Sequence, residues 1–439
     1  MIVSGARRAV AAAMSRGETE RSVGIIRRTF ESPHAESSPG DIERILRHAT
    51  AHVPRFRSLA GTRFEDLPVM SKPMMLARPE DFLSEGARPE RLASRLSSGT
   101  SGVIFRTSLD ARRMARHRAE LVAAYRYLGA DPFGSFLHCR VWFEVTPAQR
   151  AAAALRGQRL YGGEIDEESI RRTAGWLRRQ RGAVVVGLCS YLEVLLERFE
   201  DLGITLGPGA VSVVLGTGEP MTRRLAEMSL RILGVPLRMR YSNTENGLLG
   251  FSEPGGTAYK LDTSTFHVEI LDHDRDAPAA PGDVGRIVVT DLYNRAMPFI
   301  RYDTGDLGRF AVDGGGRPVP NVLAELTGRG RDFPLAGTPH APRRATHYEI
   351  LEPVERIPGL RQFQLRQHDI GRFTWIVHAD PSPDLDARLR RVLDEEIGDI
   401  LECTIVHRDG PLHSGAGKRQ TFVSEIPDPE ALLRRARPA

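Results

Sequence analysis

Residues 182–220 read GAVVVGLCSYLEVLLERFEDLGITLGPGAVSVVLGTGEP and predict a strand, a helix and a second strand in succession. The runs GAVVVGL and AVSVVLGTG are short and apolar, which is typical of strands that are buried on both faces. The segment YLEVLLERFEDLG between them is predicted to be a helix. Two buried strands joined by a helix are characteristic of a parallel sheet built from crossover units.

The same alternation continues on both sides of this stretch. FLHCRVWFEV (136–145) and PLRMRYSN (236–243) read as strands, and DEESIRRTAGWLRRQ (166–180) and TRRLAEMSLRILG (222–234) read as helices. Upstream, Asp110 can cap a long helix that ends at Gly129. From about residue 257 the pattern becomes antiparallel, with turns rich in glycine and aspartate. The last hundred residues read as a small α+β unit.

We therefore predict an α/β protein with two domains. A large N-terminal domain, 1–330, combines mixed and parallel sheets, helices and an antiparallel subdomain, and a small mobile α+β domain follows at 331–439. The boundary is placed at LTGRGRDFPLAG, where glycine and arginine cluster between the two patterns.

Composition narrows the class of protein. The chain has 439 residues, 41% hydrophobic and 27% charged, with a net charge of +5 and an isoelectric point near 9.3. This charge permits a polyanionic ligand such as a nucleotide or coenzyme A, but it is spread along the chain, which argues against a dedicated nucleic-acid surface. The three cysteines lack metal-site or disulfide spacing, and no apolar run reaches membrane-spanning length. We expect a cytoplasmic protein with no membrane partner, and the sequence leaves its oligomeric state open.

The segment SSGTSG at 97–102 offers consecutive backbone N–H groups on small residues, and such a loop can wrap the phosphates of a nucleotide. It is neither a Walker loop nor a dinucleotide-binding fingerprint, because no Lys-Ser/Thr pair or helix follows. GTGEP (216–220) and RYSNTENG (240–247) each follow a predicted strand, where ligands bind in α/β sheets. RYDTGDLGRF (301–310), LTGRGRD (326–332) and SGAGKRQ (414–420) come later.

This ordered series of motifs resembles the adenylate-forming superfamily of acyl-CoA ligases, adenylation domains and luciferases. The upstream stretch ILRHATAHVPRFRSL…FEDLPVMSK resembles the phenylacetate–CoA ligase branch, and the resemblance covers roughly residues 40 to 425. It implies a small-molecule substrate, ATP and Mg²⁺ as cofactors and coenzyme A as a candidate co-substrate. The implied first step is attack of an oxyanion on the α-phosphate of ATP with release of pyrophosphate.

The resemblance also implies roles for individual residues. Thr244 would reach a phosphate, Glu245 would hold Mg²⁺, Tyr241 would stack on adenine, Asp306 would accept from the ribose hydroxyls, and Arg329 would add a cation near ribose and phosphate. The phosphate loop would comprise Ser97, Ser98, Gly99, Thr100, Ser101 and Gly102, and the second adenine wall Gly218, Glu219 and Pro220. The substrate-pocket candidates are Arg140, Trp142, Phe143, Cys189, Ser190, Ser242 and Asn243.

Lys418 is the predicted catalytic residue. Of 61 lysine and arginine residues only Lys72, Lys260 and Lys418 are lysines, so a lysine inside a family motif is an exception to the composition. In the family this lysine bridges the attacking carboxylate and the α-phosphate. A compact ammonium on a flexible stem can enter that gap, whereas a planar guanidinium fork is wider. Lys260 shows that a lysine can also persist without an obvious role.

Three functions remain open at the level of sequence. The first is a ligase that activates a small, aryl carboxylic acid and transfers it to coenzyme A. The second is an adenylating enzyme that transfers to an amine, including a diazotase that activates nitrite for an aryl amine. The third is a nucleotide-binding protein without catalysis. Arg331 stands where relatives carry an acidic hinge, so the acceptor of the second step is not fixed by the motifs.

Overall fold

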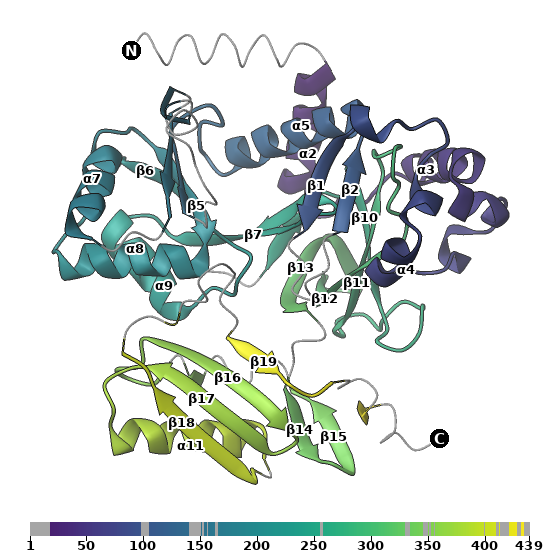
Figure 1. Cartoon of the computed structure of the whole chain (residues 1–439). Coiled ribbons are helices and arrows are strands. Elements are labelled where there is room, and N and C mark those ends of the chain that lie inside the picture. The colour runs from purple at the N-terminus through teal and green to yellow at the C-terminus, as the bar shows by residue number, and fades with distance from the viewer. Residues whose placement is uncertain are drawn as a thin grey trace.

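The computed structural model describes residues 18–97, 105–139, 151, 153–155, 157–162, 166–254, 258–329, 334–345, 350, 353, 354, 356–398, 400–409, 412, 421–427, 432 and 433. Two bodies are seen in Figure 1, a large one built on a long sheet and a smaller one below it. One extensive apolar core comes from residues 137–323, and another comes entirely from residues 336–422.

An eleven-stranded sheet in the order β10-β11-β12-β13-β9-β8-β7-β6-β5-β3-β4 organises the large body. The parallel part contains β3 (Phe136–Cys139), β4 (Gln158–Tyr161), β5 (Ala183–Leu188), β6 (Val211–Thr217) and β7 (Leu237–Asn243). The antiparallel part contains β8 (Gly247–Ser252), β9 (Tyr259–Leu261), β10 (Phe266–Leu271), β11 (Gly285–Asp291), β12 (Tyr302–Val312) and β13 (Pro318–Arg329). A separate antiparallel pair is formed by β1 (Ala93–Ser97) and β2 (Phe105–Leu109).

Helices cover the sheet in groups. The helices α7 (Glu167–Arg178), α8 (Cys189–Asp201) and α9 (Arg223–Met228) bury apolar side chains in the same core as the parallel strands, and α9 continues into a π-helical turn, η5 (Ser229–Leu233). The helices α2 (Glu18–Glu31) and α5 (Ala111–Tyr127) pack together against β8. A third group near β10 to β12 contains α3 (Pro39–His52), α4 (Lys72–Ala77), η1 (Pro54–Leu59), η2 (Phe64–Asp66), η3 (Pro79–Phe82) and η4 (Pro89–Arg91) (Figure 1).

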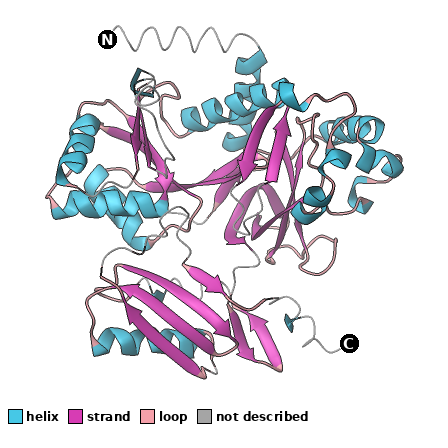
Figure 2. Cartoon of the chain, viewed as in Figure 1, coloured by secondary structure: helices cyan, strands magenta, loops and turns pink. Residues whose placement is uncertain are grey.

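The smaller body is an α+β unit. Its sheet has the order β18-β17-β16-β19, with β16 (Gln362–Asp369), β17 (Arg372–His378), β18 (Glu402–His407) and β19 (Phe422–Ser424). The helix α11 (Pro383–Glu396) lies beside this sheet, and a hairpin of β14 (Leu335–Thr338) and β15 (Ala341–Arg344) stands next to it (Figure 2). Trp375 is fully buried between sheet and helix.

The predicted fold class is confirmed, with one shift in where the antiparallel part begins. The sequence pattern placed the change near residue 257, whereas the chain already reverses between β7 and β8. The segment 244–247 is a tight hairpin turn, and Gly247 supplies a φ of 97° that other residues rarely adopt. The domain boundary after residue 330 and the mobility of the small domain remain predictions.

Asp110 caps α5 as predicted. Its Oδ1 accepts the N–H of Arg113 at 2.7 Å, which satisfies one of the donors left unpaired at a helix start, and its Oδ2 accepts the N–H of Arg295 at 2.8 Å. One side chain therefore both starts the helix and fastens it to the loop that precedes β12.

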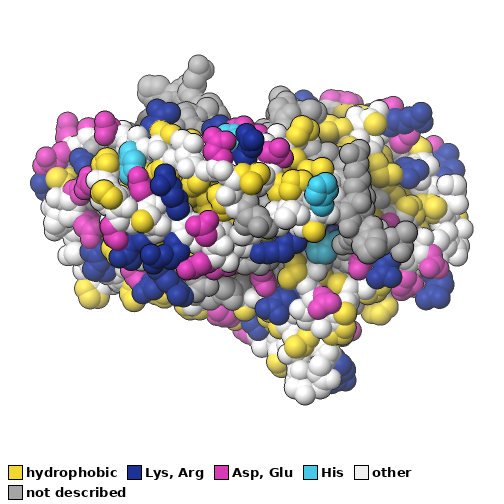
Figure 3. Space-filling model, turned by 90° about the horizontal axis from the view of Figure 1, so that it is seen from below, with side chains coloured by type: hydrophobic (Ala, Val, Ile, Leu, Met, Phe, Trp, Pro, Cys, Tyr) yellow, Lys and Arg dark blue, Asp and Glu magenta, His cyan; other side chains and the backbone are white. Residues whose placement is uncertain are grey.

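Many exposed arginines are paired with nearby carboxylates. Arg223 contacts Glu227 at 2.8 Å and Arg171 contacts Glu167 at 2.7 Å, both at helical i, i+4 spacing. On the face seen in Figure 3, basic and acidic side chains are interspersed. Among the described residues, no helix combines the length and the apolar composition needed to cross a bilayer.

A buried arginine ties the large body together. Arg113 of α5 is 1% exposed and contacts Asp291 Oδ2 at 2.5 Å, Glu120 Oε1 at 2.7 Å and the carbonyl oxygen of Asn246 at 2.5 Å. Burial opposes the charged guanidinium, but the two carboxylates outweigh it and raise the pKa of Arg113 above its ordinary value. A helix, the end of β11 and the β7–β8 turn thus share one cation.

We expect Arg113→Met to lower the free energy of unfolding of the large domain by about 3–5 kcal/mol, because it leaves two buried carboxylates without their cation. Urea unfolding followed by circular dichroism measures the change. Arg171→Met is the matched control, since its pair with Glu167 is exposed and worth about 0.5 kcal/mol or less. Equal losses in the two variants would contradict the structural role given to Arg113.

Candidate functional site

The turn between β7 and β8 carries Thr244 and Glu245. Asn243 Oδ1 accepts the N–H of Asn246 at 2.7 Å, which closes the turn from inside. At Gly247 an added Cβ would lie 2.9 Å from Arg95 Nη1 and 3.2 Å from His117 Nδ1, and φ is already left-handed. With Arg113 holding the carbonyl of Asn246 as well, the turn is fixed at its start, middle and end.

Glu245 lies between two side chains from distant parts of the chain. Its Oε1 is 3.3 Å from Nζ of Lys72, at the start of α4, and its carboxylate lies near the phenol of Tyr302 in β12. Burial and the nearby Glu245 carboxylate raise the pKa of Tyr302 above its ordinary value, so the phenol is neutral near pH 7. Glu245 itself is 7% exposed, and its contact with Lys72 restrains its orientation.

Tyr241 and Asp306 also meet, although 65 residues separate them. The Tyr241 hydroxyl donates to Asp306 Oδ2 at 2.9 Å, and burial followed by the Asp306 charge raises the pKa of Tyr241 well above its ordinary value. The Tyr241 ring is 6% exposed and packs edge-on against Tyr259, with centroids 6.4 Å apart. In the β12–β13 ladder Arg329 stands opposite Asp306.

The loop after β6 is tied to the start of α8. Leu188, the cap residue of that helix, offers no side-chain hydrogen bond, and Glu219 fills this role from the next strand–helix connection. Glu219 is 8% exposed and accepts the N–H of Ser190 at 2.7 Å and its hydroxyl at 3.0 Å. A carboxylate at a helix N-terminus satisfies unpaired donors and complements the helix dipole. Gly218 and Pro220 on either side remain exposed.

Cys189 lies beneath this loop in the core. It is fully buried, with Sγ 3.4 Å from the Glu219 carbonyl oxygen and 3.8 Å from Sδ of Met239. A Cβ added to Gly216 would lie 2.8 Å from both sulfur atoms, so the strand has no room for a side chain there. Ser190 is 3% exposed and is engaged by Glu219.

The structure thus places the described candidates at the start of α8, in the loop after β6, at the end of β7, in the β7–β8 turn and in β12. Ser242, Asn243 and Thr244 are half-buried at the end of β7 and in its turn. Only the backbones of Ser97 and Arg329 are described, at the ends of β1 and β13. The following candidates lie outside the described residues: Ser98, Gly99, Thr100, Ser101, Gly102, Arg140, Trp142, Phe143 and Lys418.

Sequence reasoning left the role of Lys72 open and did not single out Tyr302. The signal for Lys72 was present, because it is one of only three lysines and ends the stretch LPVMSK. Tyr302 lies inside the RYDTGD motif, but its contact with Glu245 depends on how β12 approaches the β7–β8 turn. No local pattern encodes that approach.

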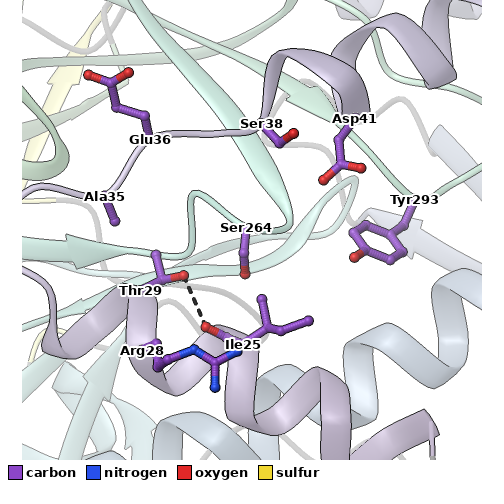
Figure 4. Close-up of a pocket in the computed structure, with 9 residues that line it drawn as sticks. All are labelled: Ile25, Arg28, Thr29, Ala35, Glu36, Ser38, Asp41, Ser264 and Tyr293. Atoms are coloured by element: carbon purple, nitrogen blue, oxygen red, sulfur yellow. Dashed lines mark hydrogen bonds between the residues drawn. The ribbon is translucent and has the colours of Figure 1, made fainter.

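A cavity of about 350 Å³ lies elsewhere, between α2, the segment leading into α3, and the loops that flank β10 and β11 (Figure 4). Its lining residues are Ile25, Arg28, Thr29, Ala35, Glu36, Ser38, Asp41, Ser264 and Tyr293. None of the predicted nucleotide residues contributes to it, and it mixes both signs of charge. It is therefore separate from the candidate site.

Known proteins resemble the chain in sequence and in fold. No protein-family model matches it. A phenylacetate–coenzyme A ligase from Thermus thermophilus is 29% identical over 295 residues, which cover 61% of this chain and 63% of that ligase. A 2-hydroxyisobutyryl-CoA ligase in complex with R3-HIB-AMP in the postadenylation state superposes with a TM-score of 0.66 at 15% identity, covering 96% of this chain and 92% of the other.

The chain has the adenylate-forming ligase fold. ATP-bound MatB from Rhodopseudomonas palustris shares this fold with a TM-score of 0.51 at 18% identity, over 81% of this chain and 71% of the other. The sequence match spans less than two thirds of the length of the Thermus ligase.

If the Tyr241–Asp306 pair belongs to a nucleotide site, Tyr241→Phe should weaken AMP binding by about three- to tenfold, because a lost hydrogen bond is worth about 1 kcal/mol. Isothermal titration calorimetry with AMP measures the effect. Tyr125→Phe is the control, since Tyr125 is buried in a different apolar cluster. Unchanged AMP affinity in Tyr241→Phe would remove this pair from the site.

Proposed function

We propose that this protein is an ATP-dependent ligase that activates a small carboxylic acid as its acyl-adenylate and then transfers the acyl group to coenzyme A. The observation that supports it most is the convergence of Tyr241 with Asp306 and of Glu245 with Lys72 within the adenylate-forming fold. The similar proteins agree with it, since phenylacetate–coenzyme A ligase and 2-hydroxyisobutyryl-CoA ligase are both named as ligases that join an acid to coenzyme A.

In the first step a carboxylate oxygen of the acid would form a bond to the α-phosphorus of ATP while the bond to pyrophosphate breaks. Negative charge moves onto the leaving group, so the protein's task is orientation and electrostatic stabilisation. Asp306 offers carboxylate oxygens that suit the two ribose hydroxyls, and the Tyr241 hydroxyl holds that carboxylate in place. The phosphate loop 97–102 would bind the β- and γ-phosphates through its N–H groups.

In the second step the sulfur of coenzyme A would bond to the acyl carbon while the bond to the AMP oxygen breaks, and the thiol proton leaves to solvent.

We assign Lys418 to the first step, between the carboxylate of the acid and the α-phosphate of ATP. Its ammonium would balance two negative charges that otherwise repel each other. Arg329 would add positive charge near ribose and phosphate.

The residues at Glu245 fit a magnesium ion held mainly by the nucleotide. Among the described residues there is no group of three or more histidine, cysteine, aspartate or glutamate side chains that could form a complete metal cage. Mg²⁺ is commonly held by one or two carboxylates together with phosphates and water, and Glu245 supplies one such carboxylate. When bound, Mg²⁺ would neutralise phosphate charge, and Lys72 would keep the Glu245 carboxylate oriented toward it.

We propose an aryl acid as the first substrate class, in line with the phenylacetate ligase relative. Pyrophosphate release from ATP should depend on the acid and on Mg²⁺ across a panel of aryl acids, amino-aryl acids and short aliphatic acids. Thioester formation, followed by mass spectrometry, should require coenzyme A. Nitrite-dependent turnover with an aryl amine would instead favour the diazotase. Silence with every acid and with nitrite would overturn the enzymatic proposal.

Lys418→Ala should lower acid-dependent pyrophosphate release by about a hundredfold or more while ATP affinity changes little, because the ammonium acts mainly on charge that develops during the reaction. Lys418→Arg should recover little of the rate, since a planar fork does not fit where an ammonium does. Lys260→Ala, on β9, is the matched control and should keep the full rate. Full activity of Lys418→Ala would refute the assigned role.

A further inference from the structure

Arg301 has an unusual backbone conformation at the start of the RYDTGD motif. Among the residues that the structure describes, it is the one non-glycine with a left-handed backbone, at φ 46°. It is also 2% exposed. Side chains disfavour this conformation, and residues held in it against that preference concentrate at functional sites. The surrounding contacts must therefore impose it.

The side chain of Arg301 supplies those contacts. Its Nε and Nη2 bind the two carboxylate oxygens of Glu269 at 3.2 and 3.0 Å, and Nη1 donates to the carbonyl oxygens of Glu65 at 2.8 Å and Leu67 at 2.5 Å. A guanidinium can serve these partners at once because its donors form a rigid fork. Arg301 therefore joins β10 to the segment that leads into α4.

The backbone around Arg301 holds the same segment again. Its carbonyl oxygen accepts the N–H of Met70 at 2.8 Å, and the N–H of Asp303 donates to the Met70 carbonyl oxygen at 2.8 Å. Met70 and Tyr302 form an isolated parallel bridge between these two stretches. The left-handed turn lets the Arg301 side chain and its carbonyl reach neighbouring points of the 65–70 segment.

The two segments joined here, 65–72 and the start of the RYDTGD motif, both lead to Glu245. Two residues beyond Met70 comes Lys72, with Nζ 3.3 Å from Glu245 Oε1, and directly after Arg301 comes Tyr302, whose phenol lies near enough to the same carboxylate for its charge to help raise the pKa of Tyr302. Lys72 is further confined by the Phe105 ring, 5.5 Å from Nζ. A movement at Arg301 would thus shift Lys72, which pairs with Glu245, together with the neighbouring Tyr302.

We infer that Arg301 is a positioning residue: its left-handed backbone and its fork of hydrogen bonds set the places of Lys72 and Tyr302 against Glu245, at the phosphate and metal end of the nucleotide site. Its catalytic consequence rests on the proposed function, whereas its effect on the 65–72 segment does not. Glu269 is its partner in this role and lies on β10, away from the nucleotide residues.

The first test is hydrogen–deuterium exchange of the 65–72 segment. Arg301→Lys keeps the charge but loses the fork, and Arg301→Gly permits the backbone conformation but removes the side chain. Both should speed exchange of the Met70 amide by about tenfold or more, with little change elsewhere. The control is Arg309→Lys in β12, the strand that follows Arg301, because the pair of Arg309 with Glu325 at 2.9 Å is partly exposed. Uniformly faster exchange throughout the domain, or unchanged exchange at Met70, would overturn the inference.

The second test compares two nucleotides by calorimetry. Arg301→Lys should weaken binding of Mg²⁺·ATP by about tenfold and leave AMP within about twofold, since AMP does not reach the Glu245 end. Equal weakening of both nucleotides, or unchanged Mg²⁺·ATP binding in Arg301→Gly, would reject the positioning role. If the parent protein bound neither nucleotide, the proposed function would fail, and the exchange experiment alone would decide the role of Arg301.

Discussion

The arrangement of the large domain depends on one buried cation, the guanidinium of Arg113. Arg113 is enclosed by Asp291, Glu120 and the carbonyl of Asn246, so α5, the end of β11 and the β7–β8 turn must assemble together for its charge to be compensated. A buried charge without its partners is strongly unfavourable, which makes this junction an all-or-nothing feature of the fold. The contact of Arg113 with the Asn246 carbonyl therefore sets the position of the turn that carries Thr244 and Glu245.

In this chain arginine and lysine make different kinds of contact because their side chains differ in shape. Arg113 and Arg301 each bind several acceptors at once from buried positions, which a planar fork does well and an ammonium does poorly. Lys72 instead brings a compact charge to one carboxylate oxygen. At these buried junctions arginine therefore joins distant segments, whereas Lys72 supplies a single point of charge to Glu245.

Local patterns predicted much of this structure because local interactions decide much of it. The strands GAVVVGL and AVSVVLGTG, the helix between them and the cap at Asp110 follow from apolar spacing and from the donors that a helix start leaves unpaired. The Tyr241, Glu245 and Asp306 candidates could be named from motifs. The contacts of Tyr241 with Asp306 and of Glu245 with Lys72 could not be predicted from them. Glu219 caps a helix that begins 30 residues earlier, and Lys72 meets Glu245 across most of the large domain, so neither contact leaves a trace in any short window. The left-handed turn at Arg301 was equally hidden, because arginine is not a residue that sequence patterns associate with positive φ.

The carboxylate of Glu219 at the start of α8 affects whether small anions from solution can bind at this helix N-terminus. A helix beginning with unpaired N–H groups is a natural resting place for phosphate, sulfate and other small anions. In this protein the N-terminus of α8 is occupied by the carboxylate of Glu219. Because Glu219 is part of the chain, its carboxylate stays close to the helix even when the hydrogen bonds break. A phosphate or sulfate ion from solution would have to displace this tethered carboxylate, so the anion-binding position at the start of α8 is already taken.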